Sequence, residues 1–273
     1  MVKSRDAPLQ DKPTRYRSLF ISDLHLGTRG CQSRQLLEFL CEVDADTIYL
    51  VGDIVDAWRL KESWYWPQEH EEIVQKLLRK ARKNARLIYV PGNHDEFLKT
   101  YIGTHFGGVE VVRKAIHDGA DGRRYLVVHG DDFDVVVRHA RWLALLGDWA
   151  YEAMLLVNAY LNRARRRMGL TYWSLSQWAK LKVKRAVNYI GDYESALVTE
   201  ARRHHADGII CGHIHHPVIH DTLGIRYMNC GDWVESCSAL VETFSGQFEL
   251  IRWSAQRESG VLGRSTLEQA AVA

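Results

Sequence analysis

Three features that would place the chain in a special class are missing or scarce. The five cysteines form no CxxC pair and no regular framework, which favours reduced thiols in the cytoplasm and argues against disulfides. Positive and negative side chains nearly balance at a net charge of +2, so the whole molecule offers no argument for a polyanionic partner. Residues 1–17 lack the apolar core of a signal peptide, so we expect a short mobile tail and no export.

What the chain does have is enough apolar sequence for a full core. Of its 273 residues 46% are hydrophobic, which suits one globular domain with room for an insertion. Short apolar runs alternate with segments of helical periodicity at 32–43 and 68–84, a pattern typical of an α/β fold. We expect strands at 18–21, 47–51, 86–90 and 125–128, and a second group at 208–211, 226–230, 237–242 and 247–253.

The domain organisation follows from where these expected elements lie. Residues 18–133 and 207–253 hold all the expected strands, so we assign them to one core. The segment 134–206 between them has a mostly helical pattern, which predicts a helical insertion. Residues 254–273 turn polar and small, which predicts a second mobile tail.

Polar motifs follow the expected strands at the point where each strand ends. Loops at the carboxyl ends of strands in open α/β sheets line the ligand crevice, so we expect these five motifs to converge on one site. They supply carboxylate, amide and imidazole groups but no thiolate. The candidate residues are Asp23 and His25, Asp53 and Asp56, Asn93 with His94 and Asp95, His129, and His213 with His215.

This donor set predicts a centre of two divalent ions. Imidazole with carboxylate suits Mn, Fe, Zn or Co better than Ca or Mg, with Mn²⁺ the favoured ion. In DLH (23–25) and HIH (213–215) one apolar residue separates two polar ones, so an extended backbone points both toward one side. Asp53 follows a strand and a glycine and has the acceptor oxygens to bridge two cations. Two ions roughly 3.5–4 Å apart can trap a bridging water, lower its pKa and hydrolyse a phosphate ester or diphosphate.

Each motif also has a purely structural interpretation. Asp and Gly are natural turn residues, and a single GD at a strand end or HxH in a loop occurs often by chance. A lone histidine is usually only a polar residue that finds a partner. Five such motifs at five strand ends of one chain favour the metal centre over a set of unrelated turns and caps.

In chain order the motifs read DxH, GDxxD, GNHD, a later H and GHxH, across residues 23–215. This series resembles the signature of the calcineurin-like metallophosphoesterases. The resemblance implies a four-layer sandwich, in which two facing mixed β-sheets are flanked by helices and the matching residues bind metal. One ion would be held by Asp23, His25, Asp53 and His215, and the second by Asp53, Asn93, His129 and His213.

The same resemblance implies roles beyond ligation. Catalytic roles fall to His94 and the neighbouring Asn93, with the His94 imidazole donating a hydrogen bond or proton to the reacting phosphoryl or leaving oxygen. We expect Asp56 and Asp95 to orient the metal ligands. Capping of a local helix or turn explains these two carboxylates equally well.

The inserted segment 134–206 separates two of the motifs, so we expect a cap that stands over the site and selects the substrate. Its stretch 142–161 is strongly apolar but contains Asp148 and Glu152, which makes it a poor membrane-spanning helix. A basic and aromatic cluster follows. The candidates for substrate binding in it are Arg163, Arg165, Arg166, Arg167, Trp173 and Trp178.

Two interpretations of this insertion stay open. Apolar surface beside arginines suits a substrate with an acyl end and phosphates, or contact with an anionic membrane surface. A helical hairpin whose apolar stripe packs on the core or on a second subunit, as in a homodimer, explains the pattern equally well.

One branch of the resembled family, which contains the UDP-2,3-diacylglucosamine diphosphatases, shares the longer blocks FISDLHLG, VGDIVDAW, VPGNHD, VVHGDDFD, CGHIHHPVIH and NCGDW. This resemblance implies cleavage of a nucleotide-linked glycolipid to UMP and an acylated sugar phosphate during lipid A synthesis. The location implied is the cytoplasm, at the inner face of the inner membrane. Two departures favour a paralogous group with another substrate: many members have arginine in place of His94, and RLKESWYW (59–66) replaces an acidic run.

Other functions compete with this one. A phosphodiesterase or phosphatase of the same family with another substrate fits the same motifs. A nuclease would need an extended basic groove, and the net charge of +2 argues against nucleic acid as a partner. A protein phosphatase would need a wide cleft, which the expected cap argues against. A non-catalytic metal-binding, membrane-docking module usually lacks some ligands, and here every motif is complete.

Overall fold

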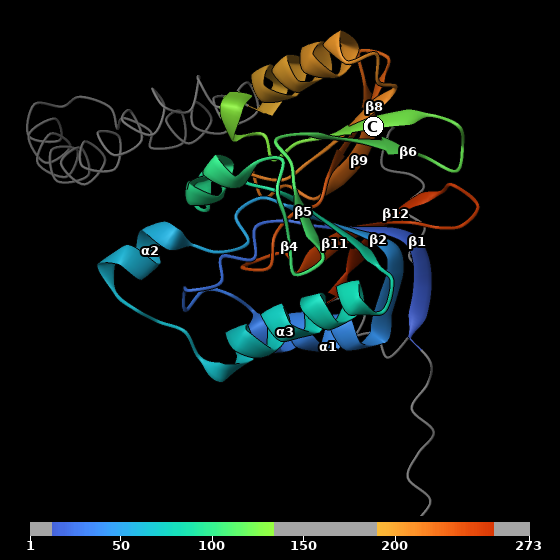
Figure 1. The fold of residues 1–273 in the computed structure, drawn as a ribbon. Helices are drawn as coiled ribbons and strands as arrows, with labels where there is room; N and C mark the ends of the chain where they lie inside the picture. Colours follow the sequence, from blue (N-terminus) through green and yellow to red (C-terminus); the bar gives the residue numbers. More distant parts are fainter. Residues whose placement is uncertain (1–12, 134–189, 254–273) are drawn as a thin grey trace, which may run out of the picture. The chain divides into compact units, whose positions relative to one another are not determined.

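The computed structural model describes residues 13–133 and 190–253 (Figure 1). The chain divides into two compact units, one formed by Met1–Asp131 with Ala201–Ala273 and the other by Asp132–Glu200. Both β-sheets belong to the first unit, and residues 190–203 are helical. No helix within the described ranges is long and apolar enough to cross a membrane.

The larger sheet has seven strands with a parallel centre. Its order is β12 (Phe248–Arg252), β11 (Ser238–Glu242), β1 (Thr14–Ile21), β2 (Val43–Val51), β3 (Arg86–Val90), β5 (Val109–Val111) and β4 (His105–Phe106). Strands β1, β2, β3 and β5 are parallel, while β11, β12 and β4 pair antiparallel. The loops that follow β1, β2 and β3 therefore leave the sheet at the same edge.

The smaller sheet has five strands and is also mixed. Its order is β6 (Ala115–Asp118), β7 (Arg124–Val127), β8 (Gly208–Cys211), β10 (Ile225–Asn229) and β9 (Val218–Thr222). Strands β7, β8 and β10 are parallel, and the two edge strands pair antiparallel.

Helices α1 (Ser33–Glu42) and α3 (Gln68–Arg82) lie side by side along one face of the larger sheet (Figure 1). Residues one helical turn apart, such as Ile73 and Leu77, are buried in the core cluster under these helices. The short helix α2 (Ala57–Glu62) follows β2, and the 3₁₀ helices are η1 (Glu96–Tyr101) and η2 (Asp131–Phe133).

The central strands are buried on both faces. Along β1, Leu19 and Ile21 belong to the cluster beneath the helices, whereas Phe20 belongs to a second cluster with residues of the smaller sheet. Phe20 stacks on Tyr49 of β2 with ring centroids 4.6 Å apart. This alternation follows from the two-residue period of a strand. The predicted fold class, two facing mixed sheets with flanking helices, is confirmed.

Several expected boundaries were wrong. β1 begins at Thr14, so residues 14–17 belong to a strand and not to the expected mobile tail. The apolar runs did not predict β4, β5, β6 and β9, because these strands are short or carry polar residues. The expected helices at 32–43 and 68–84 and the expected strands are present, with ends shifted by a few residues at most.

A buried network joins the two sheets at Glu242 of β11. Its carboxylate accepts hydrogen bonds from Arg17 Nη1 at 2.6 Å, from His117 Nε2 at 2.8 Å and from the Ala120 N–H at 2.7 Å. Burial alone would raise the pKa of Glu242, but these hydrogen bonds outweigh burial and lower the pKa to about 2. Glu242 therefore stabilises the folded state while it is ionised.

Acid is expected to destabilise the fold through Glu242. Because its folded pKa of about 2 lies below the usual value of 4.5, its stabilisation is complete above that usual value and is lost as the pH falls toward 2. Chemical unfolding should show the wild type more stable than Glu242→Gln by about 3 kcal/mol at neutral pH, with most of the difference gone near the folded pKa. Glu249→Gln, at a partly exposed site on β12, is the control. A gap that stays constant with pH would contradict this assignment.

Candidate metal centre

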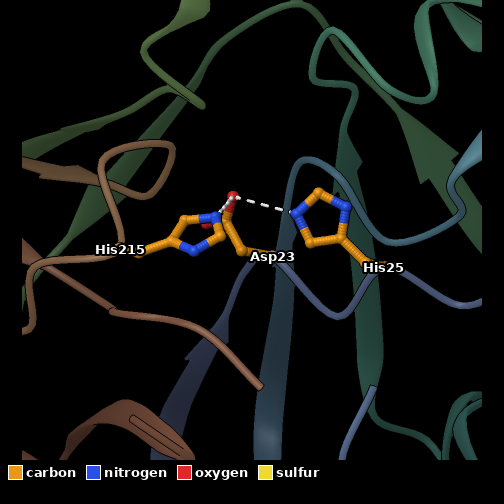
Figure 2. A group of neighbouring side chains, drawn as sticks. All are labelled: Asp23, His25 and His215. Atoms are coloured by element: carbon orange, nitrogen blue, oxygen red, sulfur yellow. Dashed lines mark ion pairs between the residues drawn. The ribbon is translucent and has the colours of Figure 1, made fainter. Parts of the chain in front are cut away.

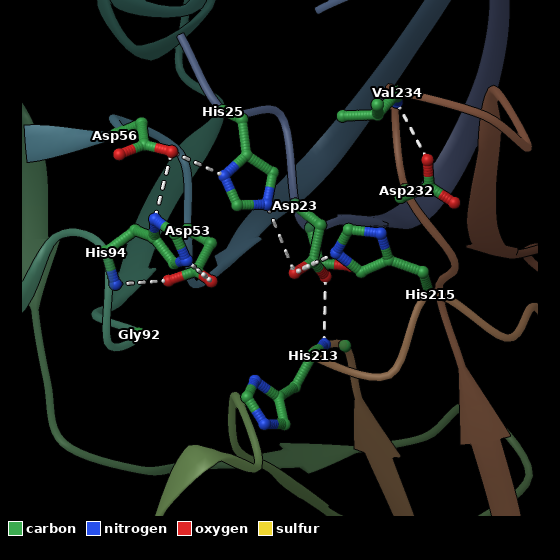
Figure 3. Close-up of polar contacts among 12 residues, drawn as sticks. Asp23, His25, Asp53, Asp56, Gly92, His94, His213, His215, Asp232 and Val234 are labelled. Carbon is green, nitrogen blue, oxygen red and sulfur yellow. Dashed lines mark hydrogen bonds and ion pairs between the residues drawn. The ribbon is translucent and has the colours of Figure 1, made fainter. Parts of the chain in front are cut away.

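Five loops carry the predicted site residues, and each begins where a parallel strand ends. The loops after β1, β2 and β3 come from the larger sheet, and those after β7 and β8 come from the smaller one. Six of the seven expected ligands fall into groups whose candidate ligand atoms lie within 4.8 Å of one another. Figure 3 shows how Asp23, His25, Asp53, His213 and His215 approach one another from separate loops.

The first group is built around the Asp23 carboxylate. Its Oδ1 lies 3.2 Å from His215 Nε2 and 4.0 Å from His25 Nε2, and Figure 2 shows the two imidazoles on either side of it. The other oxygen, Oδ2, accepts the backbone N–H of His213 at 2.9 Å. Asp23 therefore connects the loop after β1 to the loop after β8.

The second group is built around Asp53. Its Oδ2 lies 3.3 Å from His129 Nε2, and His213 completes this group. Asp53 also belongs to a third group with His25 and His94. In this group Nε2 of His94 lies 4.0 Å from Asp53 Oδ2. Asp53 is thus shared between two of the three groups, as His25 is, and its role as a bridge between two ions stays a prediction.

Hydrogen bonds orient the imidazole rings. Nδ1 of His129 lies 2.9 Å from the Val51 carbonyl oxygen, and Nδ1 of His25 lies 3.2 Å from Asp56 Oδ2. Carbonyl and carboxylate oxygens only accept, so both Nδ1 atoms carry the proton and donate it. Nε2 of both rings is thereby directed at the carboxylates of the cluster, where it can serve as a metal ligand.

The backbone at five of the seven expected ligands is left-handed, which corrects the extended conformation inferred from DLH and HIH. Such φ values are unfavourable for residues with a Cβ, and strained residues gather at functional sites. His213 and His215 enter different groups of candidate ligands. The φ values are 53° at Asp23, 49° at His25, 54° at Asp53, 71° at His213 and 52° at His215.

Two glycines make room for the cluster. A Cβ on Gly52, where φ is +77°, would overlap the His129 ring, and a Cβ on Gly92 would overlap Asp53 Oδ1 and the same ring. Any side chain at these positions would displace a candidate ligand. The glycines of the GD and GN motifs are thus explained by close approach of the loops.

Asp56 is both a helix cap and a support for imidazoles, so the two alternatives drawn from the sequence hold together. Its Oδ1 accepts the Arg59 N–H at 2.9 Å at the start of α2. Its Oδ2 lies 3.2 Å from His25 Nδ1 and 2.9 Å from His94 Nδ1. One carboxylate therefore connects α2 to both rings (Figure 3).

Asp95 acts on backbone and not on an imidazole. Its carboxylate accepts hydrogen bonds from the Ile54 N–H at 2.8 Å, the Tyr89 hydroxyl at 2.6 Å and the Gly92 N–H at 2.5 Å. Burial raises the pKa of Asp95, and the nearby charge of Asp53 adds to this effect. Asp95 fixes the loop after β3 against the loop that carries Asp53.

The electrostatics of the cluster favour positive charge. Burial raises the pKa of Asp53, but the neighbouring His129 and His94 outweigh burial and bring this pKa below its usual value. Burial lowers the pKa of His129, but the Asp53 carboxylate outweighs burial and raises this pKa to about 10. The carboxylates that stabilise a protonated imidazole here would equally stabilise a divalent cation bound between these groups.

Buried acceptor atoms test whether the residues fit metal ions. Asp23 Oδ1, Asn93 Oδ1 and His129 Nε2 are buried without a hydrogen-bond partner in the described part of the chain. Such atoms are costly unless something binds them, and all three are lone-pair donors on expected ligands. With two carboxylates, one amide and four imidazoles, the seven residues fit two divalent ions.

Sequence reasoning gave no role to residues that support the ligand loops from β10. The side chain of Asn229 donates to the Gly212 carbonyl at 2.7 Å and accepts the Gly231 N–H at 2.9 Å. The backbone N–H of Trp233 donates to the backbone carbonyl oxygen of Asp23 at 3.1 Å. These residues belong to the NCGDW block. The sequence showed this block as part of a resemblance, but gave no physical reason to assign its residues a role in supporting the ligands.

Other expectations concern residues outside the described ranges. The basic and aromatic cluster from Arg163 to Trp178 lies there, as do most of the expected cap and the C-terminal tail. The roles proposed for these segments in substrate binding, membrane contact and dimer formation stay predictions.

Two mixed sheets that bring imidazoles and carboxylates together at the ends of parallel strands define the scaffold of a metal-dependent hydrolase. The sequence model of the calcineurin-like phosphoesterases matches residues 16–217, which is more than half of the chain. The chain belongs to the calcineurin-like phosphoesterase family and is a metal-dependent hydrolase of phosphoesters.

Curated relatives share most of the chain at low identity. A UDP-2,3-diacylglucosamine hydrolase from Shewanella sp. (strain MR-7) is 26% identical over 238 residues, which cover 84% of this chain and 95% of that protein. The protein of the same name from Photorhabdus laumondii is 25% identical over 211 residues, covering 75% and 84%. Among solved structures, the phosphoesterase Yfce from E. coli is 14% identical with a TM-score of 0.41, covering 86% of this chain and 98% of that one.

Proposed function

We propose that this enzyme hydrolyses the diphosphate bond of a nucleotide-linked glycolipid of the UDP-2,3-diacylglucosamine type, giving UMP and an acylated sugar phosphate. The observation that carries the chemistry is the Asp53 carboxylate, shared between two groups of candidate ligands. The substrate class is supported by the relatives named UDP-2,3-diacylglucosamine hydrolase, whose similarity covers 95% of one of them.

The residues of the chain divide the work of hydrolysis. Two divalent ions held by the seven ligands, with Mn²⁺ the proposed metal, would neutralise phosphate charge and lower the pKa of water. Asp53 would bridge the two ions, and its Oδ1 accepts a hydrogen bond from the backbone N–H of His94 at 2.8 Å. Asp56 holds His94 through Nδ1, so that Nε2 is directed into the cluster. His94 then supplies a hydrogen bond or proton to the oxygen that leaves the phosphorus.

The test is product analysis by mass spectrometry after incubation of manganese-loaded protein with UDP-2,3-diacylglucosamine. Release of UMP and diacylated glucosamine phosphate is the expected result. A UDP-sugar without acyl chains is the matched substrate and should react far more slowly if the acyl chains are recognised. Protein stripped of metal by a chelator should give no product.

Two outcomes would overturn parts of the proposal separately. If the glycolipid stays intact while a small phosphodiester is hydrolysed, the substrate assignment is wrong, and the enzyme belongs to a paralogous group with another phosphoester substrate. This second candidate is favoured by His94 and by the aromatic segment 59–66, the two departures from the resembled branch. If neither compound reacts in the presence of metal, the catalytic assignment fails.

A further inference from the structure

Helix α2 places an indole ring directly on the proposed catalytic histidine. Trp58 lies two residues after Asp56, in the first turn of α2, and its ring centroid is 4.3 Å from that of His94 at an interplanar angle of 37°. The indole is 39% exposed, so one part of it covers the imidazole while another part faces solvent.

Other contacts of His94 fix its backbone and one nitrogen. Its N–H donates to Asp53 Oδ1 at 2.8 Å, and its carbonyl accepts the Ala57 N–H at 3.0 Å. Nδ1 faces Asp56 Oδ2 at 2.9 Å. The tilt of the ring about Nδ1 decides whether Nε2 faces Asp53, from whose Oδ2 it lies 4.0 Å.

Two aromatic rings define the plane of the imidazole. The His25 ring meets His94 edge-on, with centroids 4.7 Å apart and an interplanar angle of 88°. Trp58 provides the broader surface, because its indole lies tilted over the imidazole with centroids 4.3 Å apart, whereas His25 meets that ring edge-on. The first turn of α2 therefore contributes both a carboxylate for Nδ1 and an aromatic surface for the ring.

We infer that Trp58 is a positioning residue for His94, which holds the imidazole plane so that Nε2 faces the reacting phosphate. This inference rests on the proposed catalytic role of His94. Trp58 ends the shared block VGDIVDAW and directly precedes the segment 59–66, where the chain departs from the resembled branch, and its ring packs against a histidine that also departs from it. Trp58 and His94 then act as one unit, and α2 serves as the support of the catalytic group.

Kinetics of a small phenyl phosphodiester separate positioning from substrate binding. Trp58→Leu is expected to lower kcat about tenfold, equivalent to roughly 1.4 kcal/mol in the barrier, with KM changed less than about twofold. Trp58→Phe keeps an aromatic ring and should recover most of the rate. Trp64→Leu is the matched control, since Trp64 is a 76% exposed indole just beyond the end of α2.

Two further readouts exclude a general structural effect. In a His94→Ala background, Trp58→Leu should cause no additional loss of kcat, because the ring that it positions is absent. In zinc-loaded protein, NMR should show the imidazole proton signals of His94 moving when Trp58 becomes leucine and staying in place in Trp64→Leu. Metal content should equal that of the wild type in all single variants.

Three results would overturn the inference. A change confined to KM would show that the indole contacts substrate instead, additive losses in the double variant would show independent roles, and unmoved His94 signals would show that the ring does not depend on Trp58. Failure of the proposed function is distinguishable from each of these. It would appear as uncleaved glycolipid with the diester rates intact, or as an undiminished diester rate in His94→Ala.

Discussion

Asp53→Ala is expected to abolish hydrolysis, with turnover of a small phosphodiester reduced at least about ten-thousandfold. The physical reason is that Asp53 is the carboxylate shared by two of the three groups of candidate ligands, so its removal affects both ions at once. Its side chain is also buried against His129 Nε2 at 3.3 Å. Without this carboxylate, the cluster loses the charge that favours cations.

The measurement combines turnover with metal content per chain. Asp53→Asn is the informative second variant, because an amide oxygen can still accept the His94 N–H while the negative charge is lost. We expect Asp53→Asn to fold with a melting temperature close to that of the wild type and to bind less than the full complement of metal. Asp221→Asn, at an exposed carboxylate on β9, serves as the control for losing one negative charge. Near-normal turnover in Asp53→Ala would refute the proposal that Asp53 bridges two metal ions.

The sequence predicted the central strands well because burial on both faces forces continuous apolar runs. Strands such as β3, RLIYV, are almost entirely buried and end directly before a polar motif. Three of the four edge strands, β4, β6 and β9, could not be found in this way. Both residues of β4 are exposed, and β9 reads VIHDT with no fully buried position, so neither has a pattern that distinguishes it from a loop.

The motifs predicted which loops meet, but not how the backbone achieves it. Alternation in DLH indicated an extended segment, whereas Asp23 and His25 have φ of 53° and 49°. Nothing local to three residues specifies this conformation. It is stabilised by contacts between distant segments, such as Asp23 Oδ2 with the His213 N–H and the Asp23 carbonyl with the Trp233 N–H.

The residues that support the ligand loops and His94 could not be predicted from the sequence either, because their contacts also join segments that are distant along the chain. Asn229 reaches the carbonyl of Gly212 across two neighbouring strands, and Trp58 reaches the His94 ring across two loops. Neither pair has a spacing that a periodicity or a motif would indicate. Their roles become visible only when the two sheets bring the loops together.

His94→Ala is expected to lower kcat by about a hundredfold to a thousandfold while metal content stays unchanged. His94 belongs to one of the groups that could hold a metal, with Nε2 4.0 Å from Asp53 Oδ2. The proposed role is different, because its Nδ1 is engaged by Asp56 and its Nε2 supplies a proton or hydrogen bond to the leaving oxygen. Metal analysis of the variant separates ligand from donor directly.

A series of diesters with different leaving groups sharpens this prediction. A donor matters most when the departing oxygen is strongly basic, so the loss in His94→Ala should be small for p-nitrophenyl esters and should grow through phenyl to alkyl esters. His204→Ala, at an exposed histidine outside the cluster, is the matched control and should leave the series unchanged. A loss equal for all leaving groups, or a loss of bound metal, would reassign His94 from proton donor to ligand. In that case His94 would belong to the site, as the resemblance implies, but would bind metal instead of donating a proton.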